Sequence, residues 1–204
     1  MSSAAALKVE HLSVNYRDVQ ALRNISFAVS AGQLVGIFGP NGAGKSTLVK
    51  AMLGLTPVVM GMVHYGNTFL AAQRDRTAYV PQRSQIDWTF PATVWDVVLM
   101  GRVKSAGWLR RFSNVSRRIA MESLERVGMA DLRDRRIGAL SGGQQQRVFL
   151  ARALAQQAEV LFFDEPFVGV DQKTETVLFQ IFHELAAEGK TVLVVNHDLG
   201  ESIT

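Results

Sequence analysis

The sequence predicts an α/β fold with a mainly parallel sheet, an N-terminal antiparallel β region and an inserted helical subdomain. In the last third, the apolar runs 160–163 and 192–195 alternate with helical patterns, as parallel strands covered by helices do. The opening segment alternates apolar and polar side chains, whereas the middle third repeats its apolar residues at helical spacing. A length of 204 residues and a hydrophobic content of 48% suit one domain, which we expect to cover residues 1–204.

Short strands with one buried face are expected in the opening third, because apolar residues recur at every second position. The strands are marked by Leu7 and Val9, by Leu12, Val14 and Tyr16, and by Ile25, Phe27 and Val29. Burial of a single face favours antiparallel pairing.

A phosphate-binding loop follows the next expected strand, the apolar run 34–38. Residues 39–47 match the pattern GxxxxGK[ST] at every fixed position. They are Gly39, Pro40, Asn41, Gly42, Ala43, Gly44, Lys45, Ser46 and Thr47. Because glycine can adopt positive φ, main-chain N–H groups can turn toward an anion here.

Lys45 and Ser46 carry the charge and the metal chemistry of this loop. Lys45 offers a positive charge to β and γ phosphates, and Ser46 offers a hydroxyl to Mg²⁺. A helix expected from Leu48 to Leu53 directs its N-terminal dipole at the same anion. The sequence therefore predicts a nucleoside triphosphate site. A dinucleotide fingerprint is excluded, because GxGxxG would need a glycine in place of Thr47.

The middle third is expected to be helical. A strand over 77–80 ends at Pro81, whose ring fixes φ and whose missing N–H stops ladder pairing. Two helices follow, marked by Val94, Val97, Val98 and Leu99 and by Ile119, Leu124 and Val127. With a third helix after Ser141, they form a helical subdomain that we expect at about residues 86–150, inserted in the nucleotide-binding core.

Polar residues follow both apolar strands of the last third. Asp164 and Glu165 come directly after the first of them, and His197 follows the second. Carboxyl ends of parallel strands meet at one edge of a sheet, where ligands bind. Gly39, Asp164 and His197 should therefore lie at the same edge.

Asp164 and Glu165 suit two roles in triphosphate hydrolysis. A carboxylate held rigidly after a buried strand can bind Mg²⁺ through water, which we assign to Asp164. Glu165 faces another way and could polarise the attacking water. Taken alone, the pair could equally be a turn or a helix cap, and the phosphate-binding loop favours catalysis.

A second glycine-rich segment, Leu140-Ser141-Gly142-Gly143-Gln144, resembles the signature motif of ATP-binding cassette (ABC) ATPases. Ser141 and the main-chain N–H groups of Gly142 and Gly143, at the start of a helix, can form another anion site. The alternative is a serine N-cap after a glycine-rich turn.

The resemblance covers essentially the full chain and implies a phosphate-loop NTPase core that hydrolyses ATP with Mg²⁺. In this family the signature of one subunit closes over the triphosphate held by the other, which implies an ATP-dependent head-to-tail dimer of two copies. The resemblance assigns catalysis to Glu165, His197 and Gln82. It assigns the metal to Ser46, Gln82 and Asp164.

Four residues match further family positions. The resemblance implies that Tyr16 stacks on adenine and that Gln82 senses Mg²⁺ and water. It also implies that Asp171 crosses the dimer interface and that His197 contacts the γ phosphate. Tyr16 could instead be a core aromatic, Gln82 an exposed turn residue and His197 a structural side chain.

Segments 80–88 and 165–171 resemble the manganese, zinc and iron importer branch of the family. This implies an ATPase that powers metal import through an integral membrane permease, cytoplasmic and peripheral at the inner face of the cell membrane. An external metal-binding protein would be an indirect partner. Trp88, Phe90 and the helix from Val94 are candidates for docking the permease, although their apolar character also suits a core.

The main alternative is a soluble ABC-type ATPase acting on DNA or ribosomes. Such relatives tend to carry long coiled-coil insertions or two cassettes, whereas this chain has one phosphate loop and no heptad run. A binding-only cassette is a third possibility, but such forms usually lose the residues seen here as Glu165 or His197.

Composition adds exclusions rather than functions. A net charge of +4 is modest and indicates a solvated basic face, so no nucleic acid partner is expected. The absence of cysteine excludes disulfides and thiolate metal sites. The N-terminus does not resemble a secretory signal, and no run has the length of a membrane span. Relatives usually continue beyond the position of Thr204, so we expect a C-terminally short domain with impaired hydrolysis.

Overall fold

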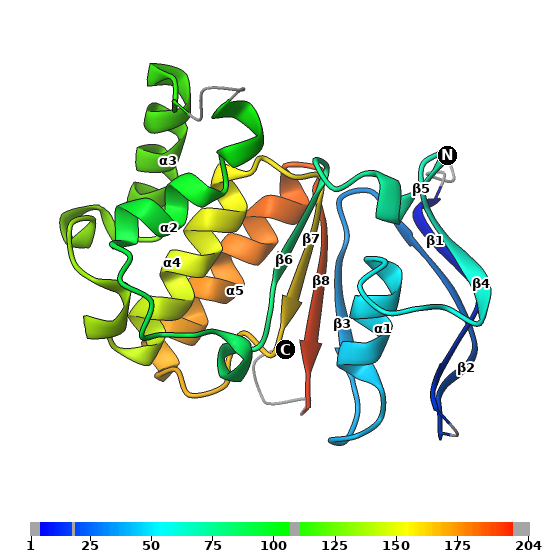
Figure 1. Cartoon of the computed structure of the whole chain (residues 1–204). Helices are drawn as coiled ribbons and strands as arrows, with labels where there is room; N and C mark the ends of the chain where they lie inside the picture. The colour runs from blue at the N-terminus through cyan, green and yellow to red at the C-terminus, as the bar shows by residue number, and fades with distance from the viewer. Residues whose placement is uncertain (1–4, 18, 107–110, 198–204) are drawn as a thin grey trace.

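Two four-stranded sheets organise the chain (Figure 1), and the computed structural model describes residues 5–17, 19–106 and 111–197. The first sheet is antiparallel with strand order β2-β1-β4-β5, and the second is parallel with order β3-β8-β7-β6. The predicted α/β class, with an antiparallel opening region, is confirmed. Residues 198–204, on which the prediction of a short C-terminal end falls, lie outside the described residues, as do residues 1–4.

The antiparallel sheet contains β1 (Ala5–Tyr16), β2 (Val19–Ser30), β4 (Met60–Tyr65) and β5 (Thr68–Phe69). The separate strands predicted around Leu7 and Leu12 are in fact one strand, so that prediction was wrong. The pairing register shifts between Val9 and Leu12, where His11 has a φ of 52°. This bulge inserts one extra residue and therefore moves the buried side chains from odd to even positions.

Strands β4 and β5 were not predicted, because their apolar residues hide the alternation. Met60 and Met62 are apolar yet 63% and 51% exposed, whereas the neighbouring Val63 is buried. Both sides of β4 therefore read as apolar, and only its pairing with β1 reveals a strand.

The parallel sheet contains β3 (Leu34–Phe38), β6 (Thr77–Val80), β7 (Val160–Asp164) and β8 (Thr191–Asn196). Helices α4 and α5 cover one face, and α1 with the antiparallel sheet covers the other (Figure 1). Leu161 and Phe163 of β7 accordingly join the hydrophobic core beside α4 and α5. Val160 and Phe162 point the other way and join the core beside α1. Burial on both faces explains why this strand reads as a continuous apolar run.

The described α-helices are α1 (Lys45–Met52), α2 (Val94–Met100), α3 (Asn114–Arg126), α4 (Gly142–Ala155) and α5 (Gln172–Ala187). Short 3₁₀ turns lie at Leu70–Ala72, Arg83–Gln85, Val103–Ala106, Ala130–Leu132 and Ile137–Ala139. Side-chain oxygens of Thr93, Ser113 and Asp171 cap the N-termini of α2, α3 and α5. Because α2 and α3 both pack on α4, the middle of the chain forms a helical layer.

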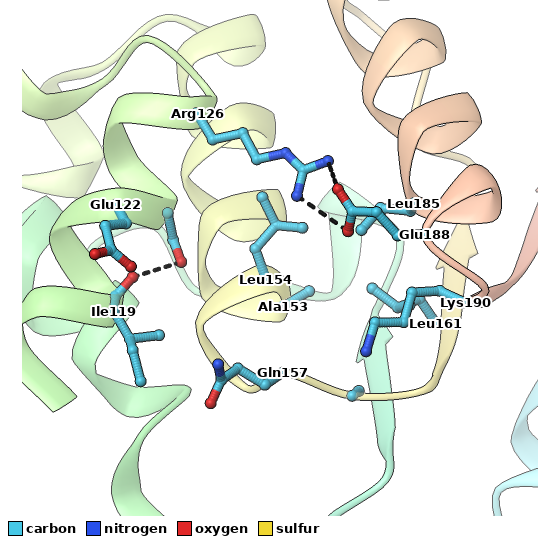
Figure 2. Close-up of a pocket in the computed structure, with 12 residues that line it drawn as sticks. Ile119, Glu122, Arg126, Ala153, Leu154, Gln157, Leu161, Leu185, Glu188 and Lys190 are labelled. Carbon is cyan, nitrogen blue, oxygen red and sulfur yellow. Dashed lines mark hydrogen bonds and ion pairs between the residues drawn. The ribbon is translucent and has the colours of Figure 1, made fainter. Parts of the chain in front are cut away.

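Arg126 ties this helical layer to the core at the last turns of α5 (Figure 2). Its guanidinium forms ion pairs with Glu184 at 3.1 Å and with Glu188 at 2.7 Å. Arg126 and Glu188 line a cavity of about 310 Å³ where α3, α4 and α5 meet, together with Leu154 and Leu185.

Candidate nucleotide-binding site

The loop between β3 and α1 has the backbone that its glycines predict. Gly42 and Gly44 have φ values of 82° and 86°, in the left-handed region that glycine adopts without strain. Gly44 is also the N-cap of α1, and a Cβ there would lie 2.8 Å from the carbonyl oxygen of Ala21. Glycine at this position therefore serves both the turn and the close approach of β2.

Lys45 places a buried cation at the centre of the loop. The side chain is only 8% exposed, and its ammonium group donates to the carbonyl oxygens of Gly39 at 2.7 Å and of Pro40 at 3.0 Å. These two acceptors offset part of the cost of burying the charge. The loop thus combines main-chain amides with one fixed positive charge, which suits an anion.

A cavity of about 430 Å³ opens over this loop. Its described lining comprises Tyr16, Val19, Gln20, Ala21, Glu165 and residues 41–47. Tyr16 is 47% exposed, and its predicted stacking on adenine stays a prediction. The lining thus brings together Tyr16, the loop and Glu165.

Asp164 lies at the end of β7 beside the loop. It is 1% exposed, and its Oδ1 accepts a hydrogen bond from the hydroxyl of Ser46 at 3.0 Å. Hydroxyl and carboxylate oxygens are ligands that hard divalent cations prefer. These two residues, 118 positions apart in the chain, therefore form a candidate cation site.

Tyr79 is a site residue that sequence reasoning missed. Its hydroxyl donates to the other carboxylate oxygen of Asp164 at 3.3 Å. Burial, and then the negative charge of Asp164, raises the pKa of Tyr79 above its usual value, so the hydroxyl keeps its proton and remains a donor. The available signal was a tyrosine three residues before Gln82, in the strand that ends at Val80.

Replacing Tyr79 with phenylalanine should lower kcat about two- to tenfold and raise the Mg²⁺ concentration needed for half-maximal activity, because a hydrogen bond that orients Asp164 is lost. ATPase rates over a Mg²⁺ titration measure both effects. Tyr65→Phe is a matched control, since that hydroxyl donates over the same 3.3 Å but to Glu159 rather than to Asp164. An unchanged Mg²⁺ requirement in Tyr79→Phe would contradict this role.

Glu165 and Gln82 meet at the carboxyl edge of the parallel sheet. The amide nitrogen of Gln82 donates to Oε2 of Glu165 at 2.5 Å. Glu165 has a φ of 52°, which is strained for a residue with a side chain, and its N–H donates to the carbonyl of Val195 at 2.9 Å. Backbone strain of this kind is typical of functional positions.

His197 follows β8 at the same edge. Asn196 pairs with Phe38, the residue before Gly39, and Val195 pairs with Asp164. The predicted gathering of Gly39, Asp164 and His197 at one edge is therefore confirmed. The side chain of His197 is exposed, and it is not among the described residues that line the cavity.

Residues 141–144 begin α4, and none of them is among the described residues that line the cavity. Ser141 accepts from the N–H of Gln144 at 3.3 Å, and the Gln144 side chain accepts from the N–H of Ser141 at 2.9 Å. This capping box orders the first turn of α4. A Cβ on Gly143 would lie 2.7 Å from Oγ1 of Thr174, so glycine is required for close packing on α5.

Asp171 lies beside the signature segment. It caps α5 by accepting from the N–H and the hydroxyl of Thr174, at 2.9 Å and 3.0 Å, and these hydrogen bonds lower its pKa. A Cβ on Gly143 would lie 3.3 Å from Oδ2 of Asp171. The two segments predicted to meet a partner subunit are therefore neighbours on one surface.

The main-chain amides of this loop surround a lysine, and a buried aspartate beside the loop contacts its serine. Together these groups can hold a triphosphate and a hard cation. This combination, after the first strand of a parallel sheet, defines the class of phosphate-loop nucleoside triphosphatases. Comparison with known proteins refines the class. Residues 22–168 match the family model described as ABC transporter, and the chain belongs to that family. It is an ATP-binding, ATP-hydrolysing domain.

Individual relatives agree with this assignment. The chain is 51% identical to the manganese transport system ATP-binding protein of Halalkalibacterium halodurans, over 96% of this chain and 78% of the relative. It is 49% identical to the zinc transport system ATP-binding protein of Treponema pallidum, over 97% and 74%. Among solved structures, the ADP conformation of an ATP-binding cassette of an ABC transporter superposes with a TM-score of 0.84 at 27% identity, covering 97% of this chain and 83% of that chain.

Proposed function

We propose that this chain is the ATP-hydrolysing subunit of a membrane transporter that imports a divalent transition metal, manganese, zinc or iron. The identity to manganese and zinc transport ATP-binding proteins supports the cargo class. The observation that carries the ATPase assignment is that Glu165 lines the cavity over the phosphate-binding loop and accepts a hydrogen bond from Gln82. The alternative, an ATPase acting on DNA or ribosomes, is not favoured by these relatives.

The site residues divide the work of hydrolysis. Lys45 and the main-chain N–H groups of residues 41–47 hold the phosphates, and Tyr16 stacks on the base. Ser46 and Asp164, with Gln82 nearby in the site, would hold Mg²⁺, which neutralises charge on the phosphates when bound.

Glu165 then accepts a proton from the attacking water, and the hydrogen bond from Gln82 orients its carboxylate. His197, at the same edge of the sheet, is placed to contact the γ phosphate. Both roles use residues that the parallel strands bring together from distant parts of the chain.

A second copy of the chain completes the site in this proposal. Ser141, Gly142, Gly143 and Gln144 do not line the cavity of their own chain, and Ser141 is exposed at the start of α4. They can therefore close over the triphosphate of a partner in a head-to-tail dimer. ATP favours the closed dimer because it contacts both subunits there, and this differential binding supplies the work of transport.

The permease would dock on the helical subdomain, about residues 86–150 of a single domain over residues 1–204. Phe90 is 56% exposed and free to make this contact, whereas Trp88 packs edge-on against Phe149 of α4. No helix in the described ranges is long and apolar enough to cross a bilayer. Attachment at the inner face of the membrane would thus rest on the permease, and an external metal-binding protein would act only through it.

Reconstitution tests the proposal. Vesicles that hold the chain on the luminal side of its membrane subunit should take up external Mn²⁺, Zn²⁺ or Fe²⁺ when ATP and Mg²⁺ are enclosed in the lumen. This uptake should stop in the Glu165→Gln variant. ATP hydrolysis that no divalent transition metal accompanies into the vesicle would contradict the cargo class. ATPase activity that is stimulated by DNA or ribosomes instead would favour the alternative.

A further inference from the structure

Arg83 follows Gln82 in the chain and binds the helix that begins with the signature segment. Its Nε and Nη2 atoms both donate to the side-chain oxygen of Gln145, at 3.1 Å and 2.9 Å. The amide of Gln145 is 3% exposed, and its nitrogen donates to the carbonyl of Ile137 at 3.1 Å. That second bond fixes which way the Gln145 amide points, so its oxygen is held toward Arg83.

The guanidinium of Arg83 is also held from the side of Trp88. It lies over the Trp88 ring, 5.5 Å from the centroid, and the indole N–H donates to the carbonyl of Arg83 at 3.1 Å. Trp88 in turn contacts Phe149 of α4 edge-on. Arg83 is therefore fixed to α4 by two routes, one polar and one aromatic.

The charge of Arg83 lies where helix stability alone would not favour it. A Cβ on Gly142 would be 3.3 Å from both Cζ and Nη1 of Arg83, so the guanidinium is beside the first turn of α4. Cations are disfavoured at helix N-termini, because the helix dipole is positive there. A neutral side chain would fill this space at lower cost, which indicates a role beyond stability.

We propose that Arg83 is a positioning residue that couples the two nucleotide sites of the ATP-bound dimer. Gln82 binds Glu165 in the site of its own chain, and the next residue binds the helix whose first turn closes the partner's site. The two contacts come from adjacent residues, at the start of the 3₁₀ turn Arg83–Gln85. A shift of Gln82 on nucleotide binding is thereby passed to Ser141, Gly142 and Gly143. This inference rests on the proposed function, because it requires the head-to-tail dimer.

Three measurements on the full chain test this role: ATP affinity of the monomer, ATP-dependent dimer affinity in the Glu165→Gln background, and the Hill coefficient of the ATPase. Arg83→Ala should leave monomer affinity unchanged, weaken the dimer about tenfold, within the usual range of coupling between sites, and lower the Hill coefficient toward one. Arg83→Lys keeps the charge but not the forked donor pair, so an intermediate effect is expected. In a double-mutant cycle, the variant that combines Arg83→Ala with Gln145→Leu should have a dimer affinity little weaker than that of either single variant.

Arg126→Ala is the matched control. It removes an arginine that also joins two helices, through Glu184 and Glu188 at the last turns of α5. Figure 2 shows the pairing with Glu188. This variant should lower the melting temperature and leave dimer affinity and the Hill coefficient unchanged. If Arg83→Ala behaves in the same way, Arg83 is merely structural and the inference fails. If the Glu165→Gln protein itself never dimerises with ATP, the dimer proposal fails first, and the inference falls with it.

Discussion

The Glu165→Gln variant should bind ATP as tightly as the parent protein and hydrolyse it about 10²- to 10⁴-fold more slowly, the usual contribution of a general base. An amide cannot accept the proton of the attacking water. The rest of the geometry should survive, because the new amide oxygen can still accept the hydrogen bond from Gln82 and the N–H of residue 165 still bonds to Val195. Phosphate release at saturating ATP measures the loss, and nucleotide titration measures the retained affinity.

The same variant should accumulate as an ATP-bound dimer, since hydrolysis no longer reopens it. Size-exclusion chromatography or small-angle scattering with Mg²⁺ and ATP would detect the doubled mass. Glu122→Gln provides the control, because that glutamate is exposed on α3 and, within the described chain, forms an ion pair with Arg118. A kcat close to that of the parent protein would remove Glu165 as the base.

The glycine and lysine spacing of residues 39–47 predicted the site because a phosphate-binding loop is a local structure. Its shape depends on positive main-chain φ values, which glycine adopts without strain, so the glycine positions in the sequence indicate where they occur. The gathering of Asp164 and His197 was predictable for a different reason. Continuous apolar runs predict parallel strands, and the residues that follow parallel strands lie at one edge of the sheet.

Contacts between distant side chains were not predictable from these patterns. Tyr79 and Asp164 are 85 residues apart, and Arg83 and Gln145 are 62 apart. Each pair meets only because β6 lies beside β7 and the turn after β6 packs on α4. Periodicity predicts which face of a strand or helix is buried, but it does not predict which polar side chains of neighbouring elements form hydrogen bonds.

Lys45→Ala should lower ATP affinity by at least about 100-fold and abolish measurable hydrolysis, because the side chain supplies the one cation that the loop places among its amides. Hydrogen bonds to charged groups contribute roughly 1.5–3 kcal/mol each, and both phosphate contacts of the ammonium are lost. The free energy of unfolding should fall by much less, about 1 kcal/mol or below, since Pro40 is exposed and water can replace the ammonium on the loop carbonyls. The variant should therefore fold normally and fail to bind.

Thermal unfolding separates these two effects. ATP raises the melting temperature of a protein that binds it only when folded, by an amount set by the ratio of ligand concentration to Kd. The parent protein should show this ATP-induced shift. Lys45→Ala should unfold at nearly the same temperature without ATP and show no shift when ATP is added. Lys104→Ala should keep the shift, because that lysine is exposed and pairs with Asp75 away from the loop. Retention of the full ATP-induced shift in Lys45→Ala would mean that the triphosphate binds elsewhere on the chain, because a loop deprived of its cation could not hold four negative charges with amides alone.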